Sequence, residues 1–289
     1  MSMTAFNQAN YVRRRIGSAV MSGLCIGAAA LGLVLLGLIL FTLLQKGVAG
    51  LSLNVFTHPM MTPGQGGGLS NAIVGSLLQV AFGILLGGPI GVAVGVYLSE
   101  VGRDGRFATV VRFVNDILLT APSVLIGLFV YQIVVRPVGG FSGFAGSVAL
   151  ALLAMPVVAR TTEDILKLVP EGYREASTAL GARNSTTIWQ VILPAGFSGI
   201  LTGLLLAVAR IAGETAPLIV TSFGSQVFSL NMAKPMSSLP MAIYRYAQSP
   251  YQEWVNLAWA GALIITFGVL ILNILSRLGH HYVSRGKSG

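Results

Sequence analysis

The chain has 289 residues, of which 54% are hydrophobic and only 9% are charged, with a net charge of +9 and a mean hydropathy of +0.78. Soluble domains carry about 25% charged residues, so this composition excludes a chain that is surrounded by water and favours an integral membrane protein. The single cysteine, Cys25, excludes an intrachain disulfide and a cysteine-based metal site.

Six apolar segments are long enough to cross a bilayer as helices, which requires about 20 residues each. Membrane β-strands are about 10 residues long and alternate in polarity, which these segments do not. In chain order the segments are 17–44, 69–98, 113–135, 143–160, 196–222 and 255–278. The sequence therefore predicts an all-α protein with six transmembrane helices. One transmembrane domain (17–279) is expected between terminal tails (1–16 and 280–289).

The basic residues predict the orientation, because loops on the cytoplasmic side carry an excess of Lys and Arg. With the N-terminus inside, four basic residues fall in outer segments, namely Lys46, Arg136, Lys234 and Arg245. Arg210 lies within a span, and the other Lys and Arg residues fall inside, including Arg13, Arg14 and Arg15. Both termini are therefore expected in the cytoplasm, and the Arg13–Arg15 cluster is interpreted as topological rather than as a nucleic-acid site.

The second segment carries four glycines at a spacing of four residues, which are Gly83, Gly87, Gly91 and Gly95. Four residues make about one helical turn, so these glycines form one flat stripe. Such a stripe allows a second helix to approach closely. We interpret it as a packing surface.

Two polar residues in the next two segments have alternative interpretations. Ser123 follows Pro122 in "TAPSV", and its hydroxyl either donates into a polar path or bonds to the backbone of a kinked helix. Arg160 ends the fourth segment. It is either an interfacial cation or a second cation of the path, paired with Glu163 or Asp164.

The inner segment between the fourth and fifth spans (161–195) contains acidic and basic residues in balance, unlike a lipid anchor, which is mostly basic. Pro170 and Gly181 are typical start and stop signals for a helix over about 171–180. Its spacing places Tyr173, Ala176 and Leu180 on one face. A second short helix is expected to follow. The pair is either a docking surface for a partner or a solvated connector.

Arg210 and Glu214 lie in the fifth apolar segment, "LLLAVARIAGETAPLIV". A central Arg raises the insertion free energy by about 2.5–3.5 kcal/mol, so Arg210 should face a cavity or another helix rather than lipid. The i, i+4 spacing predicts that Glu214 pairs with it. One carboxylate leaves guanidinium donors free for a tetrahedral oxyanion. The alternative is a fixed ion pair that ties helices together.

The stretch "EASTALGARNSTTIWQVILP" (175–194) resembles the EAA loop of ABC importer permeases. Glu175, Ala176, Gly181, Leu193 and Pro194 match the motif, and Ser177 and Val191 are small departures from it. The resemblance implies a type I ABC importer permease fold. It also implies that this loop forms coupling helices that contact an ATPase, with Glu175, Ala176, Gly181, Tyr173 and Leu180 at the contact.

Further stretches resemble the permeases of phosphate-specific ABC transporters, among them "NDILLTAPSVLIGLFVY" (115–131) and "ARIAGETAPLIVT" (209–221). The resemblance covers most of the chain from residue 69 and implies half of a path for inorganic phosphate across a bacterial cell membrane. It supports Arg210 and Glu214 as path residues and implies Arg160 as a third, while Ser123 is a candidate from its place after Pro122. The implied partners are a second homologous permease, a homodimeric ATP-binding subunit and an extracytoplasmic phosphate-binding protein.

The chain itself is not expected to hydrolyse ATP. Its only P-loop candidate, "GKS" (286–288), has His281 in place of the first glycine and no helix after it. ATP and Mg are expected on the partner subunits, with no cofactor in this chain, and His58, His280 and His281 form no metal-binding pattern. Alternatives to a phosphate permease are a permease for sulfate or molybdate and a non-transporting structural or sensory subunit.

Overall fold

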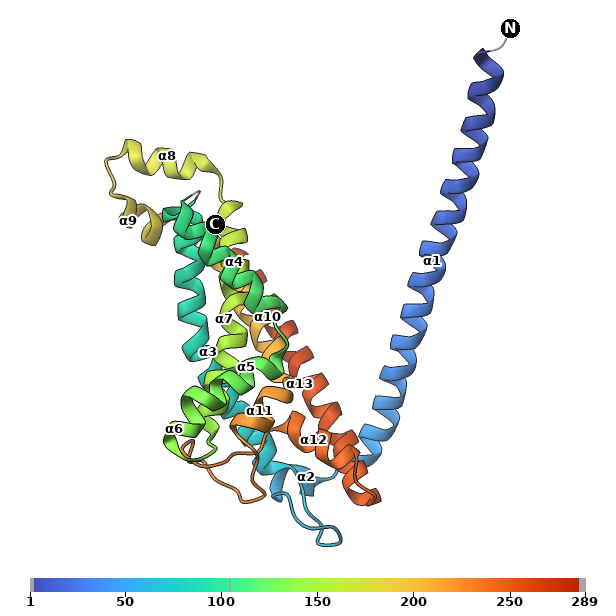
Figure 1. The fold of residues 1–289 in the computed structure, drawn as a ribbon, viewed down its shortest axis with the longest axis vertical. Coiled ribbons are helices and arrows are strands. Elements are labelled where there is room, and N and C mark those ends of the chain that lie inside the picture. Colours follow the sequence, from blue (N-terminus) through green and yellow to red (C-terminus); the bar gives the residue numbers. More distant parts are fainter. Residues whose placement is uncertain (1–2, 104, 286–289) are drawn as a thin grey trace.

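The computed structural model describes residues 3–103 and 105–285, and the side chains of residues 10–103 and 105–274. Within these residues every named element is a helix, and the one extended pairing is an isolated bridge between Phe223 and Met236. The all-α prediction is confirmed. Long helices form a bundle, while short helices gather at its two ends (Figure 1).

The elements are numbered in chain order. The α-helices are α1 (Met3–Gly50), α2 (Leu53–Thr57), α3 (Ser70–Val96), α4 (Arg106–Thr120), α5 (Ser123–Val130), α6 (Arg136–Val138), α7 (Gly143–Lys167), α8 (Glu171–Ala179), α9 (Asn184–Thr187), α10 (Leu193–Ala212), α11 (Ala216–Thr221), α12 (Leu239–Ala247) and α13 (Gln252–Arg285). Three π-helical turns continue them, η1 (Tyr97–Val101), η2 (Tyr131–Val135) and η3 (Ile188–Ile192).

Five described helices are long and apolar enough to cross a membrane, and a bent pair makes up to six. The third segment, predicted as one span over 113–135, is not one continuous helix. It consists of α4 and the α5–α6 segment, bent by 105°. Pro122 explains the bend, because proline disfavours the helical conformation in the residue before it. Ala121 is accordingly extended, with ψ 136°.

The fifth segment also differs from the prediction of one helix over 196–222. A continuous helical stretch runs over Asn184–Ala212 and ends at Gly213, and α11 begins at Ala216 with Pro217 in its first turn. Pro217 lacks an N–H donor, so the chain restarts a helix here instead of continuing one.

α7 is the centre of the bundle. In its most apolar stretch 72% of the residues are buried, compared with 28% in α3, α10 and α13. The glycine stripe of α3 lies directly against it. A Cβ at Gly87 would lie 2.6 Å from the backbone oxygen of Ala151, and one at Gly91 would lie 2.7 Å from that of Met155. Gly83 and Gly95 approach Leu150 and Thr162 in the same way. Two helices this close have no room to slide past each other.

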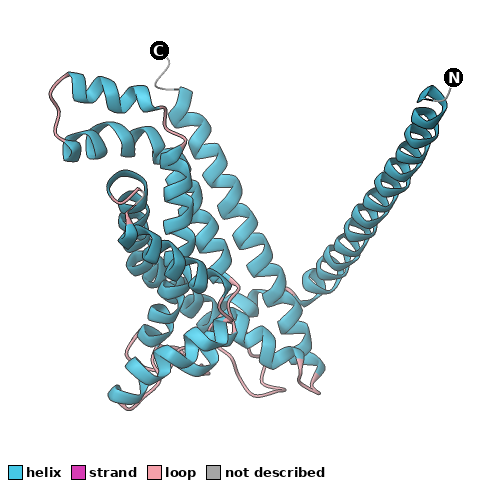
Figure 2. Ribbon diagram, turned by 45° about the horizontal axis from the view of Figure 1, so that its top comes forward, coloured by secondary structure: helices cyan, strands magenta, loops and turns pink. Residues whose placement is uncertain are grey.

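α1 stands apart from the bundle in both views (Figure 1, Figure 2). None of its most apolar stretch is buried, and it touches α13 only at its far end, where Gly47 and Gly50 lie against Leu263 and Asn256. Residues 3–16, expected as a tail, are helical and continuous with this span. The "GKS" stretch and the end of the predicted tail at 286–289 lie outside the described residues.

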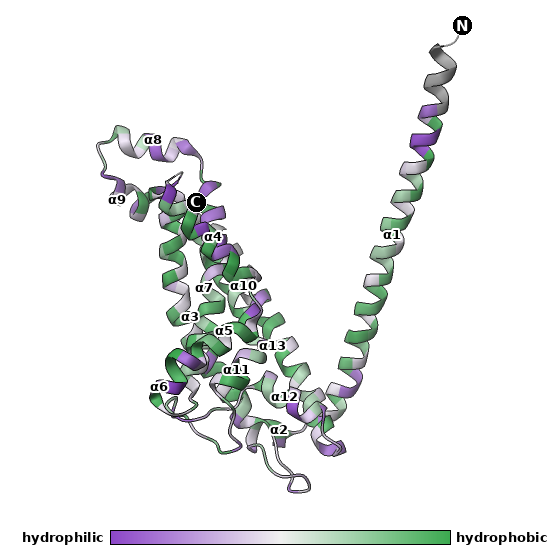
Figure 3. Ribbon diagram, in the orientation of Figure 1, coloured by the Kyte–Doolittle hydropathy of each residue, from purple (hydrophilic) through white to green (hydrophobic). Residues whose placement is uncertain are grey.

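α1 begins and α13 ends toward the end of the molecule where α8 lies (Figure 1, Figure 2). Hydrophilic residues gather at α8 and α9 and at the opposite, loop-rich end, while the middles of the long helices are apolar (Figure 3). Two polar ends and an apolar middle are what a bilayer requires of a spanning bundle.

Candidate functional site

Arg210 lies in the last turn of α10, and its side chain is exposed. Glu214 follows the end of the helix and is half-buried. The predicted Arg210–Glu214 ion pair is wrong, because neither residue forms an ion pair with any described side chain. The i, i+4 rule assumes a continuous helix, and α10 ends at Ala212 between the two residues.

The guanidinium of Arg210 therefore projects from the end of a long apolar helix without a carboxylate against it. The helix dipole favours a cation at this C-terminal end. An arginine within a membrane-spanning segment normally faces a polar cavity or another protein element, because exposure to lipid is costly. Its five N–H donors suit a planar or tetrahedral oxyanion.

The break after α10 and the bend before α5 come together in space. α5 packs on α11 so closely that a Cβ at Gly127 would lie 2.6 Å from the Cα of Pro217. Ser123 is in the first turn of α5 and is half-buried. The structure thus places Ser123 and Glu214 at the starts of two short helices in contact, two segments that the sequence separates by about 90 residues.

Arg160 lies between two carboxylates. Its Nε is 3.3 Å from Oδ2 of Asp164, and its Nη1 is 3.8 Å from Oδ1 of Asp116 on α4. The predicted pairing with Asp164 is confirmed, and the alternative with Glu163 is wrong because that carboxylate is turned toward Arg112 and Lys167. All three side chains around Arg160 remain about half exposed.

Arg160 and Arg210 stand at different depths. Thr161, the neighbour of Arg160, contacts Gly203 on α10. Arg210 is seven residues further along that helix, which is about 10 Å at 1.5 Å per residue. Arg160 is therefore nearer to the α8 end, and the two cations are not parts of one compact anion site.

The segment between α7 and α10 forms the two short helices that the sequence predicts. α8 spans Glu171–Ala179, and Gly181 ends it with a φ of +77°, a conformation that side chains disfavour. A hydroxyl–hydroxyl hydrogen bond of 2.8 Å between Ser177 and Thr187 fastens α8 to α9.

One face of α8 forms an apolar groove of about 470 Å³, called here the α8 groove. Its lining comprises Pro170, Gly172, Tyr173, Ala176, Ser177, Leu180 and Val191. Tyr173 and Leu180 are 52% and 89% exposed, and Glu175 is also exposed. Large apolar side chains held open to solvent in a concave surface are typical of a protein-binding site.

A cluster of ion pairs at the same end was missed by the sequence analysis. Glu100 binds Arg174, and Glu163 binds both Arg112 and Lys167, with N–O distances of 2.6 to 2.7 Å. The Glu163–Lys167 spacing of four was a visible signal. The partners of Glu100 and Arg112 are distant in sequence, so no local pattern indicated these two ion pairs.

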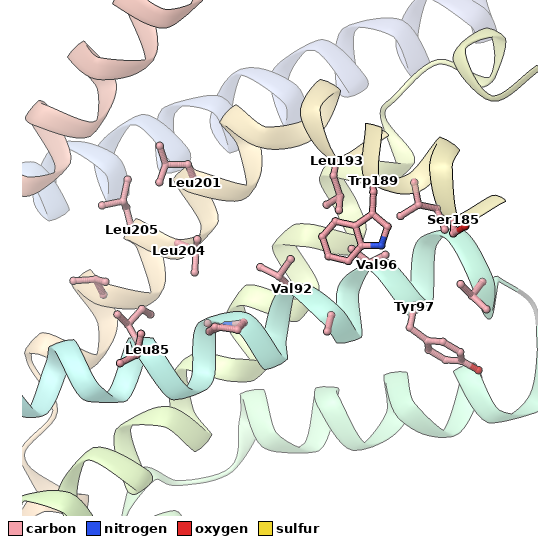
Figure 4. Close-up of a pocket in the computed structure, with 17 residues that line it drawn as sticks. Leu85, Val92, Val96, Tyr97, Ser185, Trp189, Leu193, Leu201, Leu204 and Leu205 are labelled. Atoms are coloured by element: carbon pink, nitrogen blue, oxygen red, sulfur yellow. The ribbon is translucent and has the colours of Figure 1, made fainter. Parts of the chain in front are cut away.

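A larger groove of about 850 Å³ runs between α3, η3 and α10 (Figure 4). Figure 4 shows that its walls are aliphatic side chains such as Leu85, Val92 and Leu204, with Trp189 over one end. The lining has no charged residue, and its donor-bearing side chains, Tyr97, Ser185 and Trp189, lie toward one end (Figure 4). An oxyanion needs a cation or converging hydrogen-bond donors, so we do not assign the anion site to this groove.

The described residues contain no group of three or more His, Cys, Asp or Glu side chains placed to hold a metal ion. The chemistry available in the described bundle is that of arginines, carboxylates and hydroxyls. Arginines and hydroxyls can donate hydrogen bonds to an anion, and carboxylates compete with the anion for those donors.

Residues 87–288 match the family model described as "binding-protein-dependent transport system inner membrane component". The matched range includes α7, α8, α10 and α13, and begins within α3.

Similar curated proteins share one name. The chain is 52% identical over 265 residues to the "phosphate transport system permease protein PstA" of Haemophilus influenzae, covering 92% of this chain and 94% of that protein. It is 53% identical to the protein of that name from Yersinia pestis, with 86% and 84% covered. A "probable" protein of that name from Methanocaldococcus jannaschii is 38% identical, with 69% and 71% covered.

Solved structures show the same fold. The inward-facing MetNI methionine ABC transporter aligns with a TM-score of 0.55 at 20% identity, over 75% of this chain and 92% of that one. A bacterial ABC transporter involved in the import of the acidic polysaccharide alginate aligns with a TM-score of 0.58 at 12% identity, over 74% and 79%.

Proposed function

The chain belongs to the binding-protein-dependent transport permeases, within the PstA group of phosphate transport system permeases, and we propose that it forms half of a transmembrane path for inorganic phosphate. The observation that carries the proposal is identity of about half over almost the whole chain to permeases of that name. The fold is that of the type I ABC importer permeases.

The orientation follows from charge and from the site of coupling. The α8 end carries the clustered arginines, so the positive-inside rule places it in the cytoplasm. α1 begins and α13 ends toward this end (Figure 1), so we propose that both described ends of the chain lie on the cytoplasmic side of a bacterial cell membrane.

The path is proposed to run along Arg210, Glu214, Ser123 and Arg160. Arg210 is the central anion station, because its guanidinium is exposed and free of a carboxylate from the described chain. Glu214 follows it just past the end of α10, and Ser123 begins α5, which packs against α11. Arg160 is a later station toward the cytoplasm, where Asp116 and Asp164 compete with the anion for its guanidinium and so favour release.

Other subunits supply the energy and the other half of the path. We propose a second homologous permease, whose face would meet the exposed Arg210 side of this chain. A homodimeric ATP-binding subunit, which holds ATP and Mg, would dock on α8. A phosphate-binding protein would deliver the anion to the opposite end.

The test of the substrate is uptake by the complete complex. Phosphate uptake is expected to survive a large excess of sulfate or molybdate in the medium. The control is the same complex without this chain, which should show no uptake. Competition by either anion would support the other-oxyanion alternative, and an assembled complex without any uptake would support the non-transporting alternative.

The docking surface makes a separate prediction. Replacing Leu180, which is 89% exposed in the α8 groove, with Asp puts a charge where an apolar partner surface should fit. Burial of one leucine contributes about 1.5–3 kcal/mol, so retention of the ATP-binding subunit should weaken by about tenfold to 100-fold.

The matched control is Leu168→Asp, since Leu168 is also exposed at this end, at 77%, but does not line the groove. The measurement is copurification of the ATP-binding subunit with the solubilised permease. Equal retention by the two variants would contradict docking in the α8 groove.

A further inference from the structure

Arg174 connects α8 to groups outside it with four of its five donor contacts, and the fifth goes to Glu171 of α8 itself. Its Nη2 and Nε donate to the two carboxylate oxygens of Glu100, at 2.7 and 3.0 Å. Nη2 also donates to the carbonyl oxygen of Leu166 at 3.0 Å, and Nη1 donates to that of Val169 at 2.8 Å and to Oε2 of Glu171 at 3.1 Å. A guanidinium has five N–H groups, and each one is engaged here.

The Arg174–Glu100 pair is buried, unlike its neighbours. The two side chains are 12% and 5% exposed, whereas those of the nearby Arg103–Glu171 pair are 52% and 58% exposed at a longer distance of 3.6 Å. A buried, bidentate arginine–carboxylate pair holds one geometry. An exposed single contact does not.

Two of the groups that Arg174 binds belong to a closely packed region formed by α3, η1 and α7. Glu100 is in η1, which continues α3 without a break, and the Leu166 carbonyl is in the last turn of α7, while Val169 lies just past its end. The glycine stripe presses α3 against the α7 backbone. Arg112 joins α4 to these helices, because it donates to Glu163 of α7 at 2.7 Å and to the Leu98 carbonyl of η1 at 2.9 Å.

α8 has one other described ion pair to this closely packed region, the exposed 3.6 Å contact of Glu171 with Arg103, which follows η1. Its groove face is open, with Tyr173 and Leu180 largely exposed. The hydrogen bond between Ser177 and Thr187 leads to α9 and not to α3 or α7. A push on α8 would therefore bend the chain at residues 168–170 unless Arg174 held the helix to the bundle.

We propose that Arg174, through its bidentate contact with Glu100, is the positioning residue that makes α8 and the α3–α7 pair move as one body. A displacement of α8 by the ATP-binding subunit then becomes a displacement of the α3–α7 pair, in which α7 carries Arg160 of the proposed path. This inference rests on the proposed function, because it assumes that α8 receives the force.

The test separates transmission from docking and from folding. The complete complex is reconstituted in liposomes, and the phosphate transported per ATP hydrolysed is measured for Arg174→Lys and Glu100→Gln. Lysine at position 174 keeps the charge but cannot present two parallel N–H donors to a carboxylate. Glutamine at position 100 keeps only one acceptor oxygen. Each variant is expected to retain the ATP-binding subunit and to hydrolyse ATP, while transport per ATP falls about tenfold or more.

Arg103→Lys is the matched control, because Arg103 lies at the same end but forms only the exposed contact with Glu171. It should leave transport per ATP unchanged. Because Arg174 and Glu100 act as one unit, the double variant should be no worse than the poorer single one.

Three results would overturn the inference. Unchanged transport per ATP in both single variants would show that the contact transmits nothing. Equal loss of hydrolysis and transport would indicate a merely structural role, and loss of the ATP-binding subunit would make Arg174 part of the docking surface. Failure of the proposed function itself is distinguishable, because the wild-type complex would then transport no phosphate.

Discussion

Replacing Arg210 with Ala is expected to reduce phosphate uptake by about 100-fold or more, because the anion would lose two charge-assisted hydrogen bonds worth about 1.5–3 kcal/mol each. Arg210→Lys keeps the charge but loses the two parallel N–H donors of the guanidinium, so uptake should be lower than wild type by about tenfold. The measurement is the initial rate of radiolabelled phosphate uptake in cells that express the complete complex.

Stability should change little in these variants, since the Arg210 side chain is exposed and forms no ion pair with a described residue. Copurification of the subunits checks that the complex assembles. Arg136→Ala is the matched control, because Arg136 is an exposed arginine whose contact is with Gln132 on the same helical stretch. Normal uptake in both Arg210 variants, with normal assembly, would remove Arg210 from the path.

The second large effect is expected on folding. Gly87→Leu places a side chain where a Cβ alone would lie 2.6 Å from the Ala151 carbonyl oxygen and 3.1 Å from its Cα. Both are backbone atoms, so no rotamer change relieves the clash. Overpacking typically costs about 1–3 kcal/mol, and separating α3 from the central helix α7 should add to this. The yield of folded permease should fall severalfold or more.

Gly268→Leu is the control for this substitution, because nothing lies within 4 Å of a Cβ at Gly268 on α13. Both variants add the same apolar side chain to a membrane-spanning helix. The readout is the fraction of detergent-solubilised protein that elutes as a monodisperse species after mild heating. If Gly87→Leu and Gly268→Leu gave equal yields, close α3–α7 packing would not be required for folding.

The sequence by itself determined the class of the protein and much of its fold. A hydrophobic fraction of 54% with few charges leaves no soluble alternative, and length alone identifies the spans. The glycine stripe and the α8 helix were predictable because their signals are local. Glycines at every fourth residue form one face, and Pro170 and Gly181 mark the two ends of one helix.

Breaks within spans were less predictable. Pro122 and Pro217 were visible, but a membrane helix tolerates proline when its neighbours satisfy the freed backbone groups. Pro156 illustrates this, because α7 continues through it although the proline removes the N–H donor to the Leu152 carbonyl, whereas Pro122 and Pro217 stand at a bend and at a restart. Whether a proline bends or breaks a helix therefore depends on partners that are distant in sequence.

The tertiary structure decided which charges pair wherever a helix breaks or the partners are distant in sequence. The spacing of four residues favoured an ion pair between Arg210 and Glu214, yet α10 ends between them. Arg160 pairs with Asp164, while the buried Glu163 binds Lys167 instead. Arg174 and Glu100 are 74 residues apart and meet only because α3 and α7 bring η1 beneath α8. A helical periodicity specifies neighbours within one turn, whereas a buried ion pair forms wherever packing removes two opposite charges from water together.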